Sequence, residues 1–207
     1  MYKDITGILL AGGKSSRMGV NKSFLEYKGK YIVQHMHDKL SSLFGKIIII
    51  TNTRAEYEFL GSEIHEDIYK GKGPLGGIHS GLINSQTENN FILSCDIPLI
   101  TNRSIEFIIN YPSNKKIKVP YADGYVQQLC GIYSRSLLPE IEIILNGSKS
   151  STSKCKVLNL VEETRGEIIN IEKEMPGYEK NEFLNLNNKS DYILLQNISE
   201  LRDTILK

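Results

Sequence analysis

The sequence has few of the features that mark secreted, membrane-spanning or nucleic-acid-binding proteins. Its 207 residues include three widely spaced cysteines and no CxxC pair, which argues against a zinc site or a disulfide framework. No apolar run reaches roughly 18 residues, the length of a membrane span. The 25 basic and 24 acidic residues leave a formal net charge of +1, without the basic excess typical of nucleic-acid-binding domains. We therefore expect a reduced cytoplasmic protein without a signal peptide, and neither membrane nor nucleic acid as partner.

Short apolar runs alternate with stretches of helical periodicity through the first half of the chain. Strands are predicted at residues 5–11, 46–51, 64–67 and 91–96, and helices at residues 31–44, 54–60, 74–86 and 102–110. Gly45 is placed to end the first of these helices. The alternation predicts a Rossmann-like, doubly wound α/β fold with three layers, in which a mostly parallel sheet lies between helices.

The pattern loosens after residue 111. Two strands flank the turn Ala122-Asp123-Gly124, which predicts an antiparallel hairpin over residues 116–134. Late strands are predicted at IINIEKE (168–174) and FLNLN (183–187), followed by a terminal helix capped by Asn188. Residues 148–155 are polar and small and are interpreted as a loop. Because no linker interrupts the chain, we predict a single domain over residues 1–207, with an antiparallel extension of the sheet in residues 111–207.

The end of the first predicted strand combines glycine with positive charge. Ligands of open α/β sheets bind beyond the carboxyl ends of strands. Gly12 and Gly13 let backbone N–H groups approach a ligand closely, and Arg17 and Lys22 add charge over the same turn. This combination suits phosphate, although glycine pairs also occur in ordinary turns and both basic residue types are common on surfaces. The spacing is neither that of a P-loop nor GxGxxG.

Several conspicuous residues are left out of the predicted site. The GxGxxG pattern at residues 71–76 does not follow a strong buried strand, so we interpret it as a turn that shapes a pocket wall. Cysteines in apolar strands are interpreted as core residues, and the histidines as non-ligands; these residues are Cys95, Cys130, His35, His37, His65 and His79.

The stretch LAGGKSSRMGVNK (10–22) resembles the LAGGxSxRMGxxK signature of a nucleotidyltransferase family. GPLGG (73–77), CDIP (95–98) and FLNLN (183–187) match further motifs of that family in the same order. The sequence is most similar to the branch of the molybdenum cofactor guanylyltransferases. The resemblance implies that GMP moves from GTP to the terminal phosphate of molybdenum-loaded molybdopterin and that pyrophosphate leaves. It also implies Mg²⁺ as cofactor, and handover of the labile product to molybdoenzymes or cofactor-insertion proteins is a further expectation.

Catalytic roles follow from the same resemblance. Arg17 and Lys22 are expected to stabilise the charge of the triphosphate, and Asp96, at the end of the strand FILSCD, to hold Mg²⁺. Each assignment has a simpler alternative. Asp96 could cap the helix that follows, and the two basic residues could be solvated surface charges.

Nucleotide binding is expected in residues 1–110. The backbone of Leu10, Ala11 and Gly12 is expected to contact the guanine, and the other expected nucleotide-binding residues are Gly13, Lys22, Asp67 and Asp96. The resemblance places Asp67 at the nucleotide, and its carboxylate could accept from guanine N1–H and N2–H₂, while a surface turn is the alternative. The family's nucleotide-side asparagine falls on Thr51 or Asn52, and the sequence does not distinguish them.

Acceptor binding is expected in residues 111–207. The resemblance assigns the pterin to Asn185 and Asn187, which would share one face of a strand over residues 183–187. Asparagine amides offer both donors and acceptors to a pterin edge, but the same residues also suit a turn before the last helix.

Two other functions stay open on the sequence alone. The first is cytidylyl or other nucleotidyl transfer to a phosphorylated small molecule or to molybdopterin. Cytidylyltransferase relatives tend to carry alanine at the position of Gly12, which favours a purine here. The second is a nucleotide-binding regulator without turnover, which the presence of Arg17, Lys22 and Asp96 disfavours.

Overall fold

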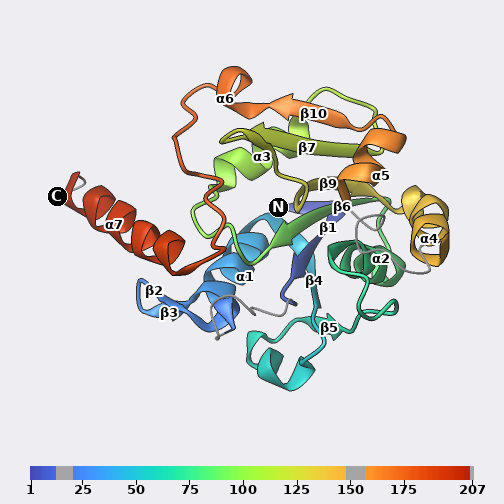
Figure 1. Cartoon of the computed structure of the whole chain (residues 1–207), viewed down its shortest axis with the longest axis horizontal. Helices are drawn as coiled ribbons and strands as arrows, with labels where there is room; N and C mark the ends of the chain where they lie inside the picture. Colours follow the sequence, from blue (N-terminus) through green and yellow to red (C-terminus); the bar gives the residue numbers. More distant parts are fainter. Residues whose placement is uncertain (13–20, 148–156, 206–207) are drawn as a thin grey trace.

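The computed structural model describes residues 1–12, 21–147 and 157–205. Within them, one eight-stranded sheet runs in the order β10-β7-β9-β6-β1-β4-β5, and β8 pairs with β7 (Figure 1). Its strands are β1 (Tyr2–Leu10), β4 (Phe44–Ile50), β5 (Glu63–His65), β6 (Asn89–Ser94), β7 (Ile117–Ala122), β8 (Tyr125–Val126), β9 (Cys130–Ser134) and β10 (Glu167–Asn170). The pairs β1–β4, β1–β6, β4–β5 and β7–β10 are parallel, whereas β9 is antiparallel to β6 and β7. The predicted fold class, including the antiparallel extension, is confirmed.

Helices cover both faces of the sheet. They are α1 (Ile32–Leu43), α2 (Pro74–Asn84), α3 (Asn102–Asn110), α4 (Leu138–Gly147), α5 (Val157–Glu163), α6 (Ile171–Glu174) and α7 (Lys189–Ile205). Short 3₁₀ helices are η1 (Lys22–Phe24), η2 (Arg54–Glu56), η3 (Glu58–Leu60) and η4 (Arg135–Leu137), and β2 (Glu26–Tyr27) pairs with β3 (Lys30–Tyr31) in a separate small hairpin. None of the described helices is long and apolar enough to cross a bilayer.

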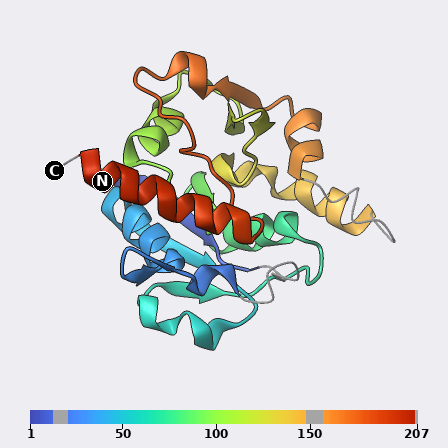
Figure 2. The same cartoon turned by 60° about the vertical axis from the view of Figure 1, so that its left-hand side comes forward.

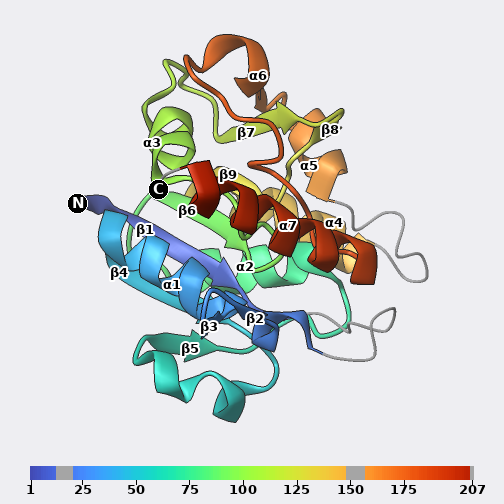
Figure 3. The ribbon, with the colours of Figure 1, turned by 90° about the vertical axis from the view of Figure 1, so that its left-hand side faces the viewer.

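Two hydrophobic clusters hold the helices on the sheet. Side chains of β1 alternate between them, since Leu9 packs with α1, α3 and α7 while Ile8 packs with α2, α4 and α5. Figures 1 and 3 show α1, α3 and α7 together on one side of the sheet, and Figure 2 shows α7 lying along that side. The Tyr192 hydroxyl of α7 donates to the Glu26 carbonyl at 2.6 Å, which ties this last helix to the first half of the chain.

The strand predicted at residues 183–187 is wrong, because this segment has no regular secondary structure. Its backbone donors are used elsewhere. The Leu186 N–H donates to the Asp96 carbonyl at 2.8 Å, and the Asn187 N–H donates to the Asp191 carboxylate at 2.6 Å. Asn188 does cap α7, since its side chain accepts from the Asp191 N–H at 3.1 Å.

Other differences from the predicted elements are smaller. The first late strand, predicted at residues 168–174, ends at Asn170, whose side chain accepts from the Lys173 N–H and thereby starts α6. Gly45 does not end a helix, because β4 begins one residue earlier in extended backbone. The hairpin turn forms with positive φ at Asp123 and Gly124, although its second strand is split into β8 and β9.

The cysteines agree with a reduced core as far as they are described. Cys95 and Cys130 are buried and form no disulfide. Cys155 and the loop predicted at residues 148–155 lie outside the described residues.

Candidate active site

The carboxyl ends of β1, β4 and β6 meet at one edge of the sheet. Leu10 pairs with Ile50 on one side and with Ser94 on the other. The Ala11 N–H continues the ladder to the Ile50 carbonyl at 2.9 Å, and the Cys95 N–H donates to the Leu10 carbonyl at 3.2 Å. Gly12 lies two residues after Leu10, and Asp96 lies two residues after Ser94, the partner of Leu10 in the sheet. The sheet register therefore places both predicted regions side by side.

Asp96 has a buried acceptor that no described residue satisfies. Its Oδ1 atom is buried and has no hydrogen-bond partner among the described residues. Burial raises the pKa of Asp96, while the Ser94 hydroxyl and the positive charge of Lys22 act in the opposite direction. A buried carboxylate oxygen without a donor is costly, so a cation or a ligand donor at this point would relieve the cost.

The donor set at Asp96 fits magnesium better than a transition metal. The part of the chain that the structure describes contains no group of three or more histidine, cysteine, aspartate or glutamate side chains able to hold a metal. Mg²⁺ is commonly held by one or two carboxylates together with substrate phosphates and water. One carboxylate near Gly12, where the sequence predicts phosphate binding, therefore suits this ion.

A short 3₁₀ helix positions Lys22. The Asn21 side chain accepts from the Ser23 N–H at 3.1 Å and donates to the Tyr57 hydroxyl at 3.2 Å, which fixes the start of η1. The Ser23 hydroxyl is hydrogen-bonded to the thiol of Cys95, whose pKa is raised by burial. This contact holds η1 against the end of β6 and brings the charge of Lys22 to Asp96.

Asp67 forms a reciprocal pair with Asn52. The Asn52 amide donates to Asp67 Oδ2 at 2.7 Å, and the Asp67 N–H donates to Asn52 Oδ1 at 3.2 Å. Thr51 is buried and lies near the Thr53 hydroxyl instead. Of the two positions that the sequence left open, Asn52 is therefore the one whose side chain joins Asp67.

Glycines bring the start of α2 against the end of β1. A Cβ on Gly77 would lie 3.3 Å from Leu10 Cδ2 and 3.6 Å from Asp67 Oδ1. A Cβ on Gly81 would lie 2.6 Å from Ile8 Cγ2, which is closer than real contacts allow. Larger side chains would push α2 off the sheet. Gly77 of the GPLGG motif thus lies in the first part of α2, next to Asp67.

The segment with the two predicted acceptor residues lies next to Asp96. The Leu186 N–H donates to the Asp96 carbonyl at 2.8 Å, and the flanking residues, Asn185 and Asn187, both line a pocket of about 700 Å³. The Asn185 amide donates to Gln127 Oε1 and to the Phe183 carbonyl, each at 3.0 Å. The structure therefore brings both asparagines to one pocket through irregular backbone rather than through strand alternation. The pocket is also lined by Asp123, Tyr125, Gln127, Glu172, Lys180, Asn181, Phe183 and Leu184.

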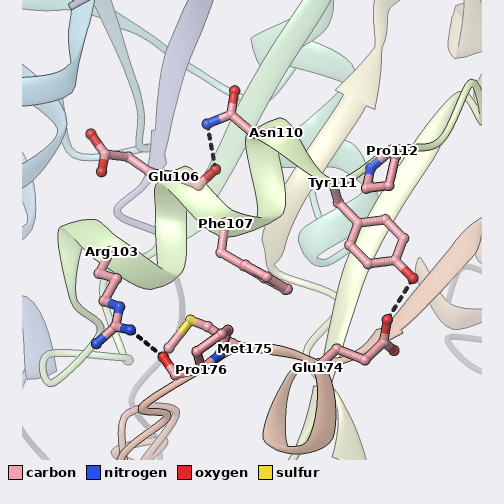
Figure 4. A pocket seen from close by; sticks show the side chains of 9 residues that line it. All are labelled: Arg103, Glu106, Phe107, Asn110, Tyr111, Pro112, Glu174, Met175 and Pro176. Carbon is pink, nitrogen blue, oxygen red and sulfur yellow. Dashed lines mark hydrogen bonds between the residues drawn. The ribbon is translucent and has the colours of Figure 1, made fainter.

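A second cavity, of about 520 Å³, lies between α3 and residues 174–176 (Figure 4). The Tyr111 hydroxyl donates to Glu174 Oε2 at 2.7 Å, and Arg103 donates to the Pro176 carbonyl. At the end of α3 that borders this cavity, the Asn110 amide donates to the Tyr2 hydroxyl, at the start of β1. Since none of the predicted site residues lines this cavity, it is not part of the candidate active site.

Comparison with known proteins shows to which family the chain belongs. A family model of the MobA-like NTP transferase domain matches residues 7–158, well over half of the chain. The chain belongs to the MobA-like NTP transferase family. Its sequence motifs at residues 10–22, 73–77 and 95–98 all fall inside the matched range.

Relatives extend the likeness over nearly the whole length of this NTP transferase. It is 32% identical over 204 residues to a Carboxydothermus hydrogenoformans protein named "Probable molybdenum cofactor guanylyltransferase", covering 97% of this chain and 100% of that protein. It is 31% identical over 192 residues to the molybdenum cofactor guanylyltransferase of Syntrophotalea carbinolica, covering 90% and 88%. The crystal structure of molybdopterin-guanine dinucleotide biosynthesis protein A from Archaeoglobus fulgidus superposes with a TM-score of 0.72 at 21% identity, covering 94% and 98%, and shows the shared fold.

The structure brings to the pocket three residues that the sequence does not single out, Gln127, Asp123 and Glu172. Away from this pocket, the contact with Asp67 distinguishes Asn52 from Thr51. The only sequence signal for Asp123 was its place in a hairpin turn, which predicts conformation but not a neighbouring pocket. Gly13 and Arg17, which the sequence assigns to the nucleotide, lie outside the described residues.

Proposed function

We propose that this NTP transferase moves GMP from GTP to the terminal phosphate of molybdenum-loaded molybdopterin. Pyrophosphate leaves, and the molybdopterin guanine dinucleotide cofactor forms. The observation that carries the proposal is the buried Asp96 Oδ1 atom, which has no hydrogen-bond partner among the described residues. Asp96 follows the strand that pairs with β1, and its carbonyl accepts from Leu186, which lies between the pocket residues Asn185 and Asn187. The relatives named molybdenum cofactor guanylyltransferase supply the substrate class.

The nucleotide is bound by the first half of a single domain, residues 1–110. Lys22, with Arg17 as expected from the sequence, neutralises the triphosphate as negative charge shifts to the leaving pyrophosphate. The Ala11 N–H is already donated to the Ile50 carbonyl, so the base contacts of Leu10, Ala11, Gly12 and Gly13 use other backbone groups of this turn.

Asp67 accepts from the guanine edge. Its Oδ2 atom receives the Asn52 amide, and each carboxylate oxygen can accept more than one hydrogen bond. Asn52 therefore orients Asp67 without using up its acceptors.

Asp96 holds Mg²⁺ in this proposal. When bound, the ion supplies positive charge to the phosphate oxygens that both substrates bring. The protein's own contribution is positional, because Asp96 lies at the boundary of the two halves and its carbonyl fixes the acceptor segment through Leu186.

The acceptor is bound by residues 111–207, with Asn185 and Asn187 facing the pterin-bearing substrate. A labile product bound in a pocket with an open face suits direct handover to a molybdoenzyme or a cofactor-insertion protein. This partner class is part of the proposal.

The choice of GTP over CTP depends on Gly12. A Cβ at this position would lie 3.8 Å from Thr51 Cα and 3.9 Å from the Ile50 carbonyl, which is ordinary contact. The fold itself would accept alanine, so the space at Gly12 is available for a larger base. A competition assay with Mg²⁺ and both nucleotides should favour GTP by at least about tenfold, or about 1.4 kcal/mol. Preference for CTP would instead support the cytidylyl alternative, and binding without turnover would support a regulator.

A further inference from the structure

The acceptor pocket has two chemically different regions. One region adjoins Asp96, because Asn185 directly precedes Leu186, whose N–H donates to the Asp96 carbonyl. This region contains neutral amides, since the Asn185 amide donates a hydrogen bond to Gln127 Oε1 at 3.0 Å. The other contains the carboxylates of Asp123 and Glu172. Among the described residues, Glu172 and Lys180 act electrostatically on Asp123, whereas Lys22 acts on Asp96.

The backbone of Asp123 is held in place beside Glu172. This residue occupies the hairpin turn with φ of 52°, and its N–H donates to Glu172 Oε1 at 2.6 Å. No described residue donates a hydrogen bond to its side chain, and the side chain is half-buried at the pocket. Burial and the neighbouring Glu172 raise the pKa of Asp123, with Lys180 opposing. A half-buried carboxylate to which no described residue donates suits a ligand that carries hydrogen-bond donors.

The pterin end of the proposed acceptor suits binding to carboxylates, whereas its phosphate and metal end does not. Its phosphate and sulfur-bound metal are negatively charged or electron-rich, so carboxylates would repel that end. Its pterin carries a ring N3–H and a 2-amino group side by side, which match the two oxygens of a carboxylate. Lys180, at the same pocket, offsets part of the negative charge when both carboxylates are ionised.

We propose that Asp123, positioned by Glu172, accepts hydrogen bonds from the N3–H and 2-amino edge of the pterin and thereby selects and orients the acceptor. This inference rests on the proposed function, because it takes molybdopterin as the acceptor. With the pterin at Asp123, the phosphate end faces the Asn185 side of the pocket, toward Asp96 and Lys22. The pocket thus decides which end of the acceptor reaches the nucleotide.

The decisive variant is Asp123→Asn. Asparagine tolerates the left-handed backbone of this turn, so the hairpin is kept while one acceptor oxygen becomes a donor. We expect the KM for molybdopterin to rise about 10- to 100-fold, the range for loss of a charge-assisted hydrogen-bond pair, with the KM for GTP unchanged within about twofold. Glu172→Gln keeps an oxygen for the Asp123 N–H and should raise the same KM only a few-fold. Glu106→Gln, an equal charge change at the exposed surface of α3, is the matched control and should change neither constant.

A binding measurement tests the pocket without turnover. Pterin and lumazine differ in that lumazine carries an oxygen in place of the 2-amino group, and both fluoresce. Titrated into the full-length protein, pterin should bind the wild type about tenfold more tightly than lumazine, and Asp123→Asn should bind both alike. Equal binding of the two compounds by the wild type, or unchanged discrimination and unchanged acceptor KM in Asp123→Asn, would overturn the inference. A wild type that discriminates pterin but forms no guanine dinucleotide would overturn the proposed function and leave the pterin site standing.

Discussion

The two halves of the candidate site are built in different ways. The nucleotide side lies at the ends of β1, β4 and β6, where the sheet ladder sets the distance between Gly12 and Asp96. The acceptor side lies on irregular backbone at residues 183–187, where single side-chain bonds such as Asn185–Gln127 set the shape. We therefore expect the backbone of the nucleotide side to keep its position when one polar contact is lost. The backbone of the acceptor side should change its shape when it loses one. The predictions below test this contrast, beginning with the largest expected effect.

Asp96→Asn should separate stability from activity at the boundary between the halves. Turnover should fall about 10²- to 10³-fold, the range found when a single electrostatic contact to the reacting groups is removed. The ligand-free protein should unfold at an equal or higher temperature, because a neutral isostere replaces a buried carboxylate whose Oδ1 has no partner among the described residues. Steady-state kinetics and thermal unfolding check the two effects. Undiminished turnover would exclude the metal-binding role.

Asn185→Ala should affect the acceptor alone. The substitution removes donors to Gln127 and to the Phe183 carbonyl, so a buried glutamine oxygen loses its partner and the pocket relaxes. The KM for molybdopterin should rise about tenfold. The KM for GTP serves as the internal control, and an equal rise in both constants would show that the halves are not independent.

Asp67→Asn should affect the nucleotide alone. The sheet keeps residue 67 in place, but one guanine acceptor is lost and the Asn52 contact is rearranged. GTP should bind about 3- to 10-fold more weakly, while CTP, which lacks the N1–H and N2–H₂ edge, should bind as before. Isothermal titration with each nucleotide makes the comparison. A parallel loss for CTP would mean that Asp67 does not read the base.

Gly12→Ala should leave the fold intact and narrow the base pocket. Since the added Cβ makes only ordinary contacts with Thr51 and Ile50, the unfolding temperature should change little. The ratio of GTP to CTP affinity should fall by a few-fold, in line with about 1 kcal/mol of steric cost. An unchanged ratio would remove Gly12 as a determinant of base choice.

The smallest effect concerns pH. The pKa of Asp96 is higher in the folded protein than in the unfolded chain, so ionised Asp96 destabilises the ligand-free fold above that raised pKa. As the pH falls below the raised pKa, Asp96 is protonated in the folded protein before it is protonated in the unfolded chain. The destabilisation therefore declines and is gone once the pH lies below the pKa of the unfolded chain. The stability advantage of Asp96→Asn should therefore shrink from neutral toward acidic pH. Denaturant titrations of both proteins across this range check the sign.

The same contrast explains what could be predicted from the sequence. The β-branched run of β4 and the strand FILSCD indicated buried parallel strands, and parallel strands bring their carboxyl ends together, so the neighbourhood of Gly12 and Asp96 followed. Residues 183–187 alternate like a strand, but the Leu186 N–H donates to the carbonyl of Asp96, which is distant in the sequence, and no local pattern reports such a partner. Asn52 could not be distinguished from Thr51 because the choice depends on how the loops after β4 and β5 meet. For Asp123, the sequence indicates a place in a hairpin turn but does not indicate a neighbouring pocket.

Guanylyl transfer at the shared edge is tested most directly by mass spectrometry of the product. Purified protein is incubated with GTP, Mg²⁺ and molybdenum-loaded molybdopterin, in parallel with Asp96→Asn. The account predicts a mass corresponding to the guanine dinucleotide form of the cofactor and release of pyrophosphate with the wild type, and almost none with the variant. No dinucleotide from the wild type, or equal amounts from both proteins, would contradict it.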